Sequence, residues 1–168
     1  MNVIVIAMLI CFTAGLIGET HSYAYEKEVI AMELGGYSQV CAYAYAVYGD
    51  KMAKKRDYKT AMRCYSKSIH LKQGQKNLEL YLCSRGFFYL DLHNYDAARA
   101  DFSKAIDLNP KYACSYAGRG DALLALGDLT GAAKDYEQSV RLDPSFEKYS
   151  LTRFERLDRA KLKLRPQL

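Results

Sequence analysis

Side chains capable of catalysis or metal binding are scattered along this chain and form no recognisable motif. The three histidines, His21, His70 and His93, lack metal-binding spacing, and no HExxH run occurs. The glycine pair Gly35-Gly36 stands alone and does not resemble a phosphate-binding loop. Carboxylates are plentiful but dispersed, as on any solvated surface. The sequence therefore predicts no enzyme, no cofactor, no metal site and no small-molecule substrate, and it favours binding to a protein or peptide.

The elements that would present a binding surface are expected to be helices. The chain has 168 residues, enough for one domain, and 50% of them are apolar and 26% charged. Only three prolines occur, and Ala, Leu, Lys, Arg and Glu are frequent, a composition typical of helical proteins. We therefore expect an all-α fold.

The first 24 residues differ in character from the rest. Residues 3–17 are almost wholly apolar, and Ser22-Tyr-Ala24 places small residues before a cleavage point after Ala24. This layout predicts a signal peptide, although no Lys or Arg stands at its start. An uncleaved membrane anchor over residues 3–17 and a buried core helix are the alternatives, and the run is shorter than the ~20 residues of a spanning helix. We expect an exported protein, periplasmic or secreted, or one held at a membrane by residues 3–17.

Six sets of residues recur with the same two spacings, 37 and then 34 residues. A period near 34 residues is typical of stacked helical repeats, so the spacing indicates three units. The sets are Gly49/Gly86/Gly120, Asp57/Asn94/Asp128, Ala61/Ala98/Ala132, Tyr65/Phe102/Tyr136, Ser68/Ala105/Ser139 and Leu71/Leu108/Leu142.

The second and third units resemble tetratricopeptide repeats. The motifs that carry the resemblance are Arg85-Gly86, Tyr95-Asp-Ala-Ala98 and Asp107-Leu-Asn-Pro110, then Arg119-Gly120, Ala132 and Leu142-Asp-Pro144. The first unit follows the same columns but ends in Gln73-Gly74 instead of proline. The resemblance implies a right-handed superhelix of three helix hairpins, over residues 42–75, 79–112 and 113–146.

Simple physical rules support hairpins in these units. Asp57, Asn94 and Asp128 stand where a second helix would begin, and such side chains cap helix N-termini. A repeat glycine allows two helices to approach closely, and a large aromatic ring fills the remaining gap. Residues 25–41 are expected to be a lead-in or short helix. Residues 147–168 are expected to form a basic amphipathic helix that covers the last hairpin and ends in a tail.

By the same resemblance, the first helix of each unit lines a concave groove that binds a peptide segment or a partner subunit. Apolar groove residues would anchor the ligand, and three aspartates would favour positive charge in it. The alternative is that aromatic residues such as Phe87 simply contact the next helix. The predicted groove residues are Tyr43, Asp50, Leu80, Phe87, Leu90, Asp91, Asp121 and Leu124.

Some members of this family hold a C-terminal carboxylate through Lys and Asn on the same face. At the matching places this chain has Ala46 and Asp50, then Ser84 and Gly118. The sequence therefore predicts that chaperone tails are not the ligand. Arg85 and Arg119 precede the repeat glycines, a common family feature for which we expect a structural role.

The alternative function is binding of an anionic surface or nucleic acid through the basic C-terminal helix. The formal net charge is +5, and the tail holds many of the cations. A merely solvated helix face is the plainer interpretation, and export argues against nucleic acid. Self-association through an edge hairpin, and either disulfides or free thiols for Cys41, Cys64, Cys83 and Cys114, also remain open. The cations of the tail are Arg153, Arg156, Arg159, Lys161, Lys163 and Arg165.

Overall fold

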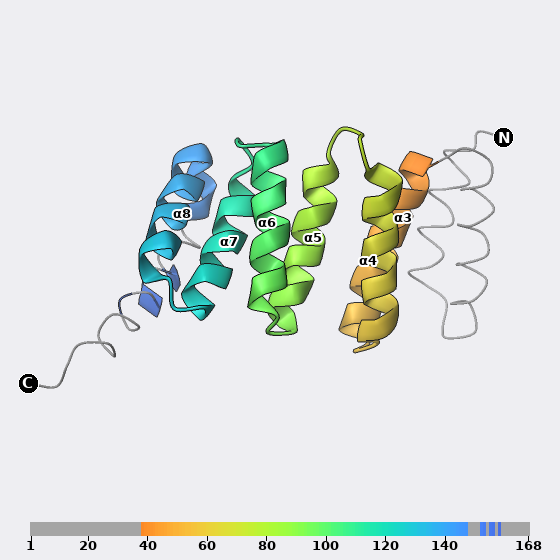
Figure 1. Cartoon of the computed structure of the whole chain (residues 1–168), viewed down its shortest axis with the longest axis horizontal. Coiled ribbons are helices and arrows are strands. Elements are labelled where there is room, and N and C mark those ends of the chain that lie inside the picture. The colour runs from red at the N-terminus through yellow and green to blue at the C-terminus, as the bar shows by residue number, and fades with distance from the viewer. Residues whose placement is uncertain (1–37, 148–151, 154, 157, 159–168) are drawn as a thin grey trace, which may run out of the picture. The chain divides into compact units, whose positions relative to one another are not determined.

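The computed structural model describes residues 38–147, 152–153, 155–156 and 158, and these residues form helices and connecting turns without a strand (Figure 1). The predicted all-α fold of three helix hairpins is confirmed for this part of the chain. The predicted signal peptide or anchor at residues 1–24, and residues 25–37 of the lead-in, lie outside it. Among the described helices, none has the length and apolar character needed to cross a membrane.

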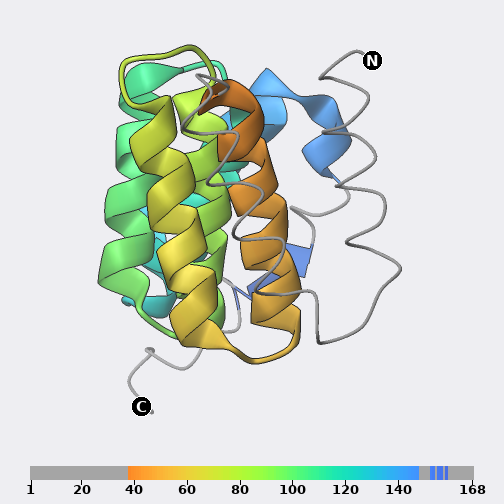
Figure 2. The same cartoon turned by 90° about the vertical axis from the view of Figure 1, so that its right-hand side faces the viewer.

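Two compact units divide the chain, residues 1–76 and residues 77–168. The described part of the first unit is one hairpin, in which α3 (Ser38–Lys54) runs antiparallel to α4 (Tyr58–Lys72) (Figure 2). The helix α3 begins four residues before the first repeat unit predicted from the sequence. The Tyr65 ring is buried beside Gly49, where a Cβ atom would lie 3.0 Å from the ring. The repeat glycine therefore allows the close approach that the sequence indicates.

The second unit contains the other two hairpins. The helix α5 (Leu78–Asp91) packs on α6 (Tyr95–Leu108), and α7 (Ala113–Ala125) packs on α8 (Leu129–Leu142). The contact between α6 and α7 joins the two hairpins, and a short 3-10 turn, η2 (Pro144–Phe146), follows. Phe102 and Tyr136 are the two largest fully buried side chains. Each lies on the second helix of its hairpin and faces the first.

The turn between the two helices of each hairpin has the same construction. The side chain of Asp57, Asn94 or Asp128 accepts a hydrogen bond from a backbone N–H three residues further on, so the predicted caps are confirmed. The residue before each cap has a positive φ, 62° at Arg56, 57° at His93 and 87° at Gly127. Only the third hairpin has a glycine at this left-handed position.

Phe102 also fixes the junction between the two hairpins of the second unit. A Cβ atom on Gly86 of α5 would lie 2.9 Å from its ring, and one on Gly118 of α7 would lie 2.3 Å away. Both distances are shorter than real contacts, so the ring occupies the space in which side chains at these two positions would stand. Gly118 therefore has a packing role that its place on a predicted groove did not suggest.

Part of the predicted C-terminal helix is described. Thr152, Arg153, Glu155, Arg156 and Asp158 are helical, and the rest of residues 148–168 lies outside the described part of the chain.

Candidate functional site

In the first unit, one narrow stripe of α3 is exposed. It consists of Tyr43, Val47, Asp50 and Lys54, which share one helix face because they are three or four residues apart. Tyr43 is 59% exposed, whereas residues between these positions, such as Tyr45 and Tyr48, are buried. Asp50 accepts a hydrogen bond from the Tyr65 hydroxyl of α4. The structure therefore places predicted residues Tyr43 and Asp50 together, with Asp50 already paired within its hairpin.

In the second unit, the predicted residues of α5 differ in exposure. Leu80 is 41% exposed and Asp91 is also exposed, while Phe87 and Leu90 are half-buried. The Phe87 ring packs edge-on against Phe102, with 5.0 Å between ring centroids. Phe87 thus contacts the core of its own hairpin, as the alternative interpretation held, and Leu80 and Asp91 are the more accessible members.

On α7, Asp121 is enclosed by two partners. The Tyr136 hydroxyl of α8 donates to Asp121 Oδ1 at 2.9 Å, and the Arg153 guanidinium donates through Nε and a terminal nitrogen, the shortest distance being 2.8 Å. Arg153 also lies over the Tyr136 ring, 5.9 Å from its centroid. Burial, followed by the nearby Asp121 carboxylate, raises the pKa of Tyr136. The negative charge of Asp121 is therefore balanced by the chain itself.

Leu124, the last predicted residue of α7, packs against Ala132 and Tyr136 of α8. We call the six residues of the second unit the α5–α7 face. Their role in binding stays a prediction, and the structure separates accessible from packed members. The α5–α7 face comprises Leu80, Phe87, Leu90, Asp91, Asp121 and Leu124.

Three of the predicted positions, Asp50, Phe87 and Asp121, each contact the aromatic residue 15 positions later in the sequence. Tyr65 pairs with Asp50 and Tyr136 pairs with Asp121, each through its hydroxyl. In the second hairpin both members are apolar, since Phe87 contacts Phe102. A buried tyrosine hydroxyl needs a hydrogen-bond partner, whereas a phenyl ring needs an apolar neighbour. The residue types at the two positions of each pair therefore differ together from one hairpin to the next. This signal was present in the sequence and was not recognised there.

The repeat arginines have the structural role expected of them. Arg85 donates two hydrogen bonds to Asp101, at 2.7 and 2.9 Å, and Arg119 donates two to Asp135, at 2.7 and 2.8 Å. Hydrogen bonding to the aspartate raises the pKa of each arginine, which stays charged. Both pairs are 16 residues apart and join the two helices of one hairpin. Bidentate geometry makes these contacts stronger than ordinary surface ion pairs.

Among the described residues, Cys83 and Cys114 are free thiols, and Cys41 and Cys64 are buried. A hydrogen bond joins Cys83 Sγ to Ser115 Oγ at 3.1 Å, between α5 and α7. Burial raises the pKa of Cys83 to about 12 and also raises that of Cys114. Neither thiol has the lowered pKa of a reactive cysteine.

The positions where some tetratricopeptide proteins hold a carboxylate are occupied differently here. Ala46 is buried and Asp50 is acidic and exposed, while Ser84 donates its hydroxyl to the backbone oxygen of Leu80 at 3.2 Å. At Gly118, a side chain would collide with Phe102. On α7, the position that would hold a carboxylate-binding side chain therefore has no space for one.

Comparison with known proteins gives a consistent picture. The family model described as tetratricopeptide repeat matches residues 89–145. Mouse serine/threonine-protein phosphatase 5 is 35% identical over 92 residues, which are 55% of this chain and 18% of that protein. The first TPR of Spaghetti (RPAP3) bound to HSP90 peptide SRMEEVD has a TM-score of 0.63 and 29% identity, and the match covers 72% of this chain and 93% of that one. The second TPR of the same protein, bound to the same peptide, has a TM-score of 0.58 and 30% identity, over 70% and 99% of the two chains.

The match to whole proteins is short. The chain spans between 10% and 18% of the length of the first curated relatives that it matches. The similarity therefore concerns only a part of each of those proteins.

Proposed function

Because this chain belongs to the tetratricopeptide repeat family, we propose that it is a non-catalytic scaffold that binds a protein or peptide segment on the first helices of the two hairpins in its second unit. The observation that carries the proposal is that α5 holds the exposed Leu80 and, two or more turns further along, the half-buried Phe87 and Leu90. Apolar side chains one and two turns apart suit the anchors of a bound segment. Exposed Asp91, on the same helix, favours a ligand with a nearby positive charge.

The ligand that we propose differs in chemistry from the peptides bound by the two structural neighbours. SRMEEVD is acidic. On the second unit, Asp91 is an exposed carboxylate, and Gly118 has no space for a cationic side chain. Like charges would repel an acidic tail, so we propose a segment with apolar anchors and Lys or Arg. A position in the cell envelope, reached through residues 1–24, belongs to the same proposal and rests on the sequence of that segment alone.

The experiment is selection of binding peptides from a displayed random library, with the full chain as bait. The test variant is Leu80→Ser with Asp91→Lys, since both side chains are exposed. The matched control is Leu108→Ser with Asp107→Lys, an exposed leucine and aspartate on the second helix of the same hairpin. We expect wild type and control to enrich peptides with apolar and basic residues, and the test variant to lose them. Equal enrichment by both variants, or preference for SRMEEVD, would contradict the proposal.

A further inference from the structure

The charge of the chain is divided sharply between its two units. Residues 38–76 hold nine Lys and Arg against two Asp, a formal charge of +7, which exceeds the +5 of the whole chain. Residues 77–147 hold seven Lys and Arg against eleven Asp and Glu, a formal charge of −4. The first hairpin is therefore a second strongly basic region, separate from the C-terminal tail. A charge of this size produces a local potential that attracts polyanions.

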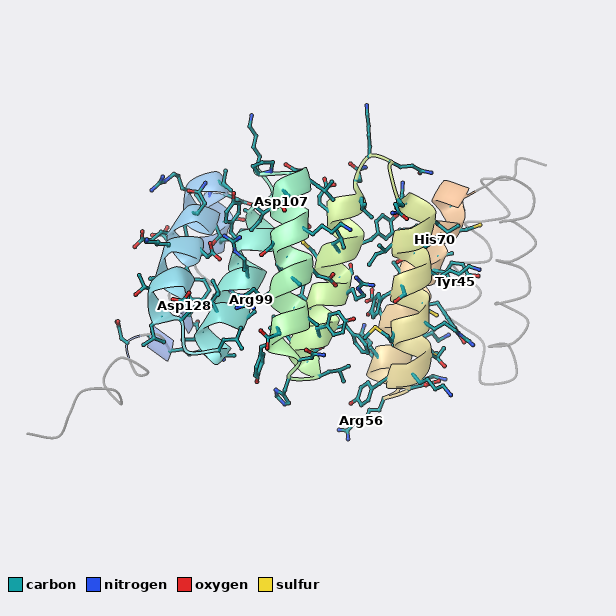
Figure 3. All side chains as sticks on the ribbon, in the orientation of Figure 1. Tyr45, Arg56, His70, Arg99, Asp107 and Asp128 are labelled. Carbon is teal, nitrogen blue, oxygen red and sulfur yellow. The ribbon has the colours of Figure 1, made fainter. Side chains whose placement is uncertain are left out.

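Four of these cations cluster where the chain turns from α3 to α4. We call Lys54, Lys55, Arg56 and Lys59 the basic turn, and all four side chains are exposed. The carboxylate within this stretch, Asp57, accepts a hydrogen bond from Thr60 N at 3.1 Å as the cap of α4. In Figure 3 the Arg56 side chain extends away from the ribbon at this end of the hairpin. The basic turn is thus an exposed, positively charged connection, and its one carboxylate accepts a backbone hydrogen bond.

We propose that the basic turn docks on an anionic lipid bilayer. Clusters of Lys and Arg at a surface bind the headgroups of acidic lipids. Three of the four cations are lysines, compact point charges that suit a fluid array of headgroups better than bidentate recognition of one phosphate. Tyr58, within the same turn, is 43% exposed, and tyrosine is enriched at the boundary between headgroups and hydrocarbon.

Two further observations favour a bilayer over nucleic acid or an acidic protein. The proposed signal or anchor at the apolar residues 3–17 would bring the chain to a membrane, in contrast to the alternative of a buried core helix. The negative charge of residues 77–147 would be repelled by the same bilayer, so the attraction concentrates on the first hairpin. A duplex is usually read by a helix or strand in a groove, whereas the basic turn is a tight connection between two helices.

The test is vesicle sedimentation with the full chain. One set of vesicles is phosphatidylcholine alone, and the other contains about one-third phosphatidylserine. The test variant replaces the basic turn, Lys54→Gln, Lys55→Gln, Arg56→Gln and Lys59→Gln. The matched control removes the same charge from exposed positions of the second unit, by Lys104→Gln, Lys111→Gln, Lys134→Gln and Arg141→Gln. The ratio of binding to the two vesicle types cancels any contribution of the apolar residues 3–17.

We expect the wild type and the control to prefer anionic vesicles by roughly 10- to 100-fold at low salt, and the test variant to lose most of that preference. Circular dichroism should show the same helix content in all three proteins. Equal preference in test and control would overturn the proposal. So would a loss confined to binding of duplex DNA or polyglutamate, which would assign the basic turn to one of those partners instead.

Discussion

The first and third hairpins share an aspartate cap, a repeat glycine packed against a tyrosine ring, and a hydrogen bond from that tyrosine to an aspartate. They differ in a second pair of positions that links the two helices. In the third, Arg119 and Asp135 form a bidentate ion pair. The corresponding residues of the first are Tyr48 and Cys64, both buried. The backbone arrangement therefore does not require the ion pair. In the first hairpin, two buried side chains without formal charge stand at the positions of the ion pair.

The largest loss of stability is expected when only one member of the ion pair in the third hairpin is replaced by the corresponding residue of the first hairpin. Asp135→Cys leaves the Arg119 guanidinium half-buried without its carboxylate, and should cost about 2–3 kcal/mol of unfolding free energy. Adding Arg119→Tyr completes the Tyr48/Cys64 arrangement and should restore at least half of that loss. Urea denaturation of both single variants and the double variant measures the coupling between the positions. Additive losses would mean that the two side chains act independently.

A smaller difference should separate the repeat glycines. A Cβ atom at Gly120 would lie 2.5 Å from the Tyr136 ring, whereas one at Gly49 would lie 3.0 Å from Tyr65. Gly120→Ala should therefore cost about 1–3 kcal/mol through overpacking. Gly49→Ala should be close to neutral, because the gain of about 1 kcal/mol in helix propensity offsets the tighter contact. Thermal unfolding followed by circular dichroism compares the two variants, and equal losses would show that the spacing does not decide the outcome.

The second hairpin tests the pairing of aromatic and acidic residues. Phe102→Tyr buries a hydroxyl beside Phe87, and should cost about 1–2 kcal/mol. Phe87→Asp in the same chain recreates the pair seen in the other two hairpins and should recover part of the loss. The free energy of unfolding of the two single variants and the double variant decides the point. A double variant less stable than Phe102→Tyr alone would refute the pairing.

The smallest effects concern the residues with positive φ. Arg56 has a left-handed backbone conformation, which is unfavourable for a residue with a Cβ atom. Arg56→Gly removes this cost and should stabilise the first hairpin by about 1 kcal/mol. Gly127→Ala introduces the same strain into the third hairpin and should destabilise it by a similar amount. Chemical denaturation checks both signs. An unchanged midpoint in either variant would indicate that the turn relaxes around the substitution.

The sequence was a good guide to the hairpins and a poorer one to the candidate site. Asp57, Asn94 and Asp128 predicted the start of each second helix because an N-cap depends on local contacts. Asp121 was predicted as a groove residue from its position alone, and its contact with Arg153, 32 residues away, depends on packing that the repeat pattern does not specify. The positive charge of the first hairpin follows directly from the sequence, as does that of the tail. Arg153, one of the tail's cations, is engaged with Asp121.

The side-chain pairs that hold each hairpin together have a consequence for how such chains arise. The pairs of residues 15 and 16 positions apart both lie within one hairpin. A duplicated stretch of 34 codons would therefore encode both members of each pair. The contact of Phe102 with Gly118 is different, because it reaches into the next hairpin. A newly copied unit placed after the second hairpin would fold against its neighbour only if it kept a small residue at that place. Lengthening of this chain by duplication would therefore depend on the side chains at the junction between hairpins, Gly118 among them, more than on the pairs within each hairpin.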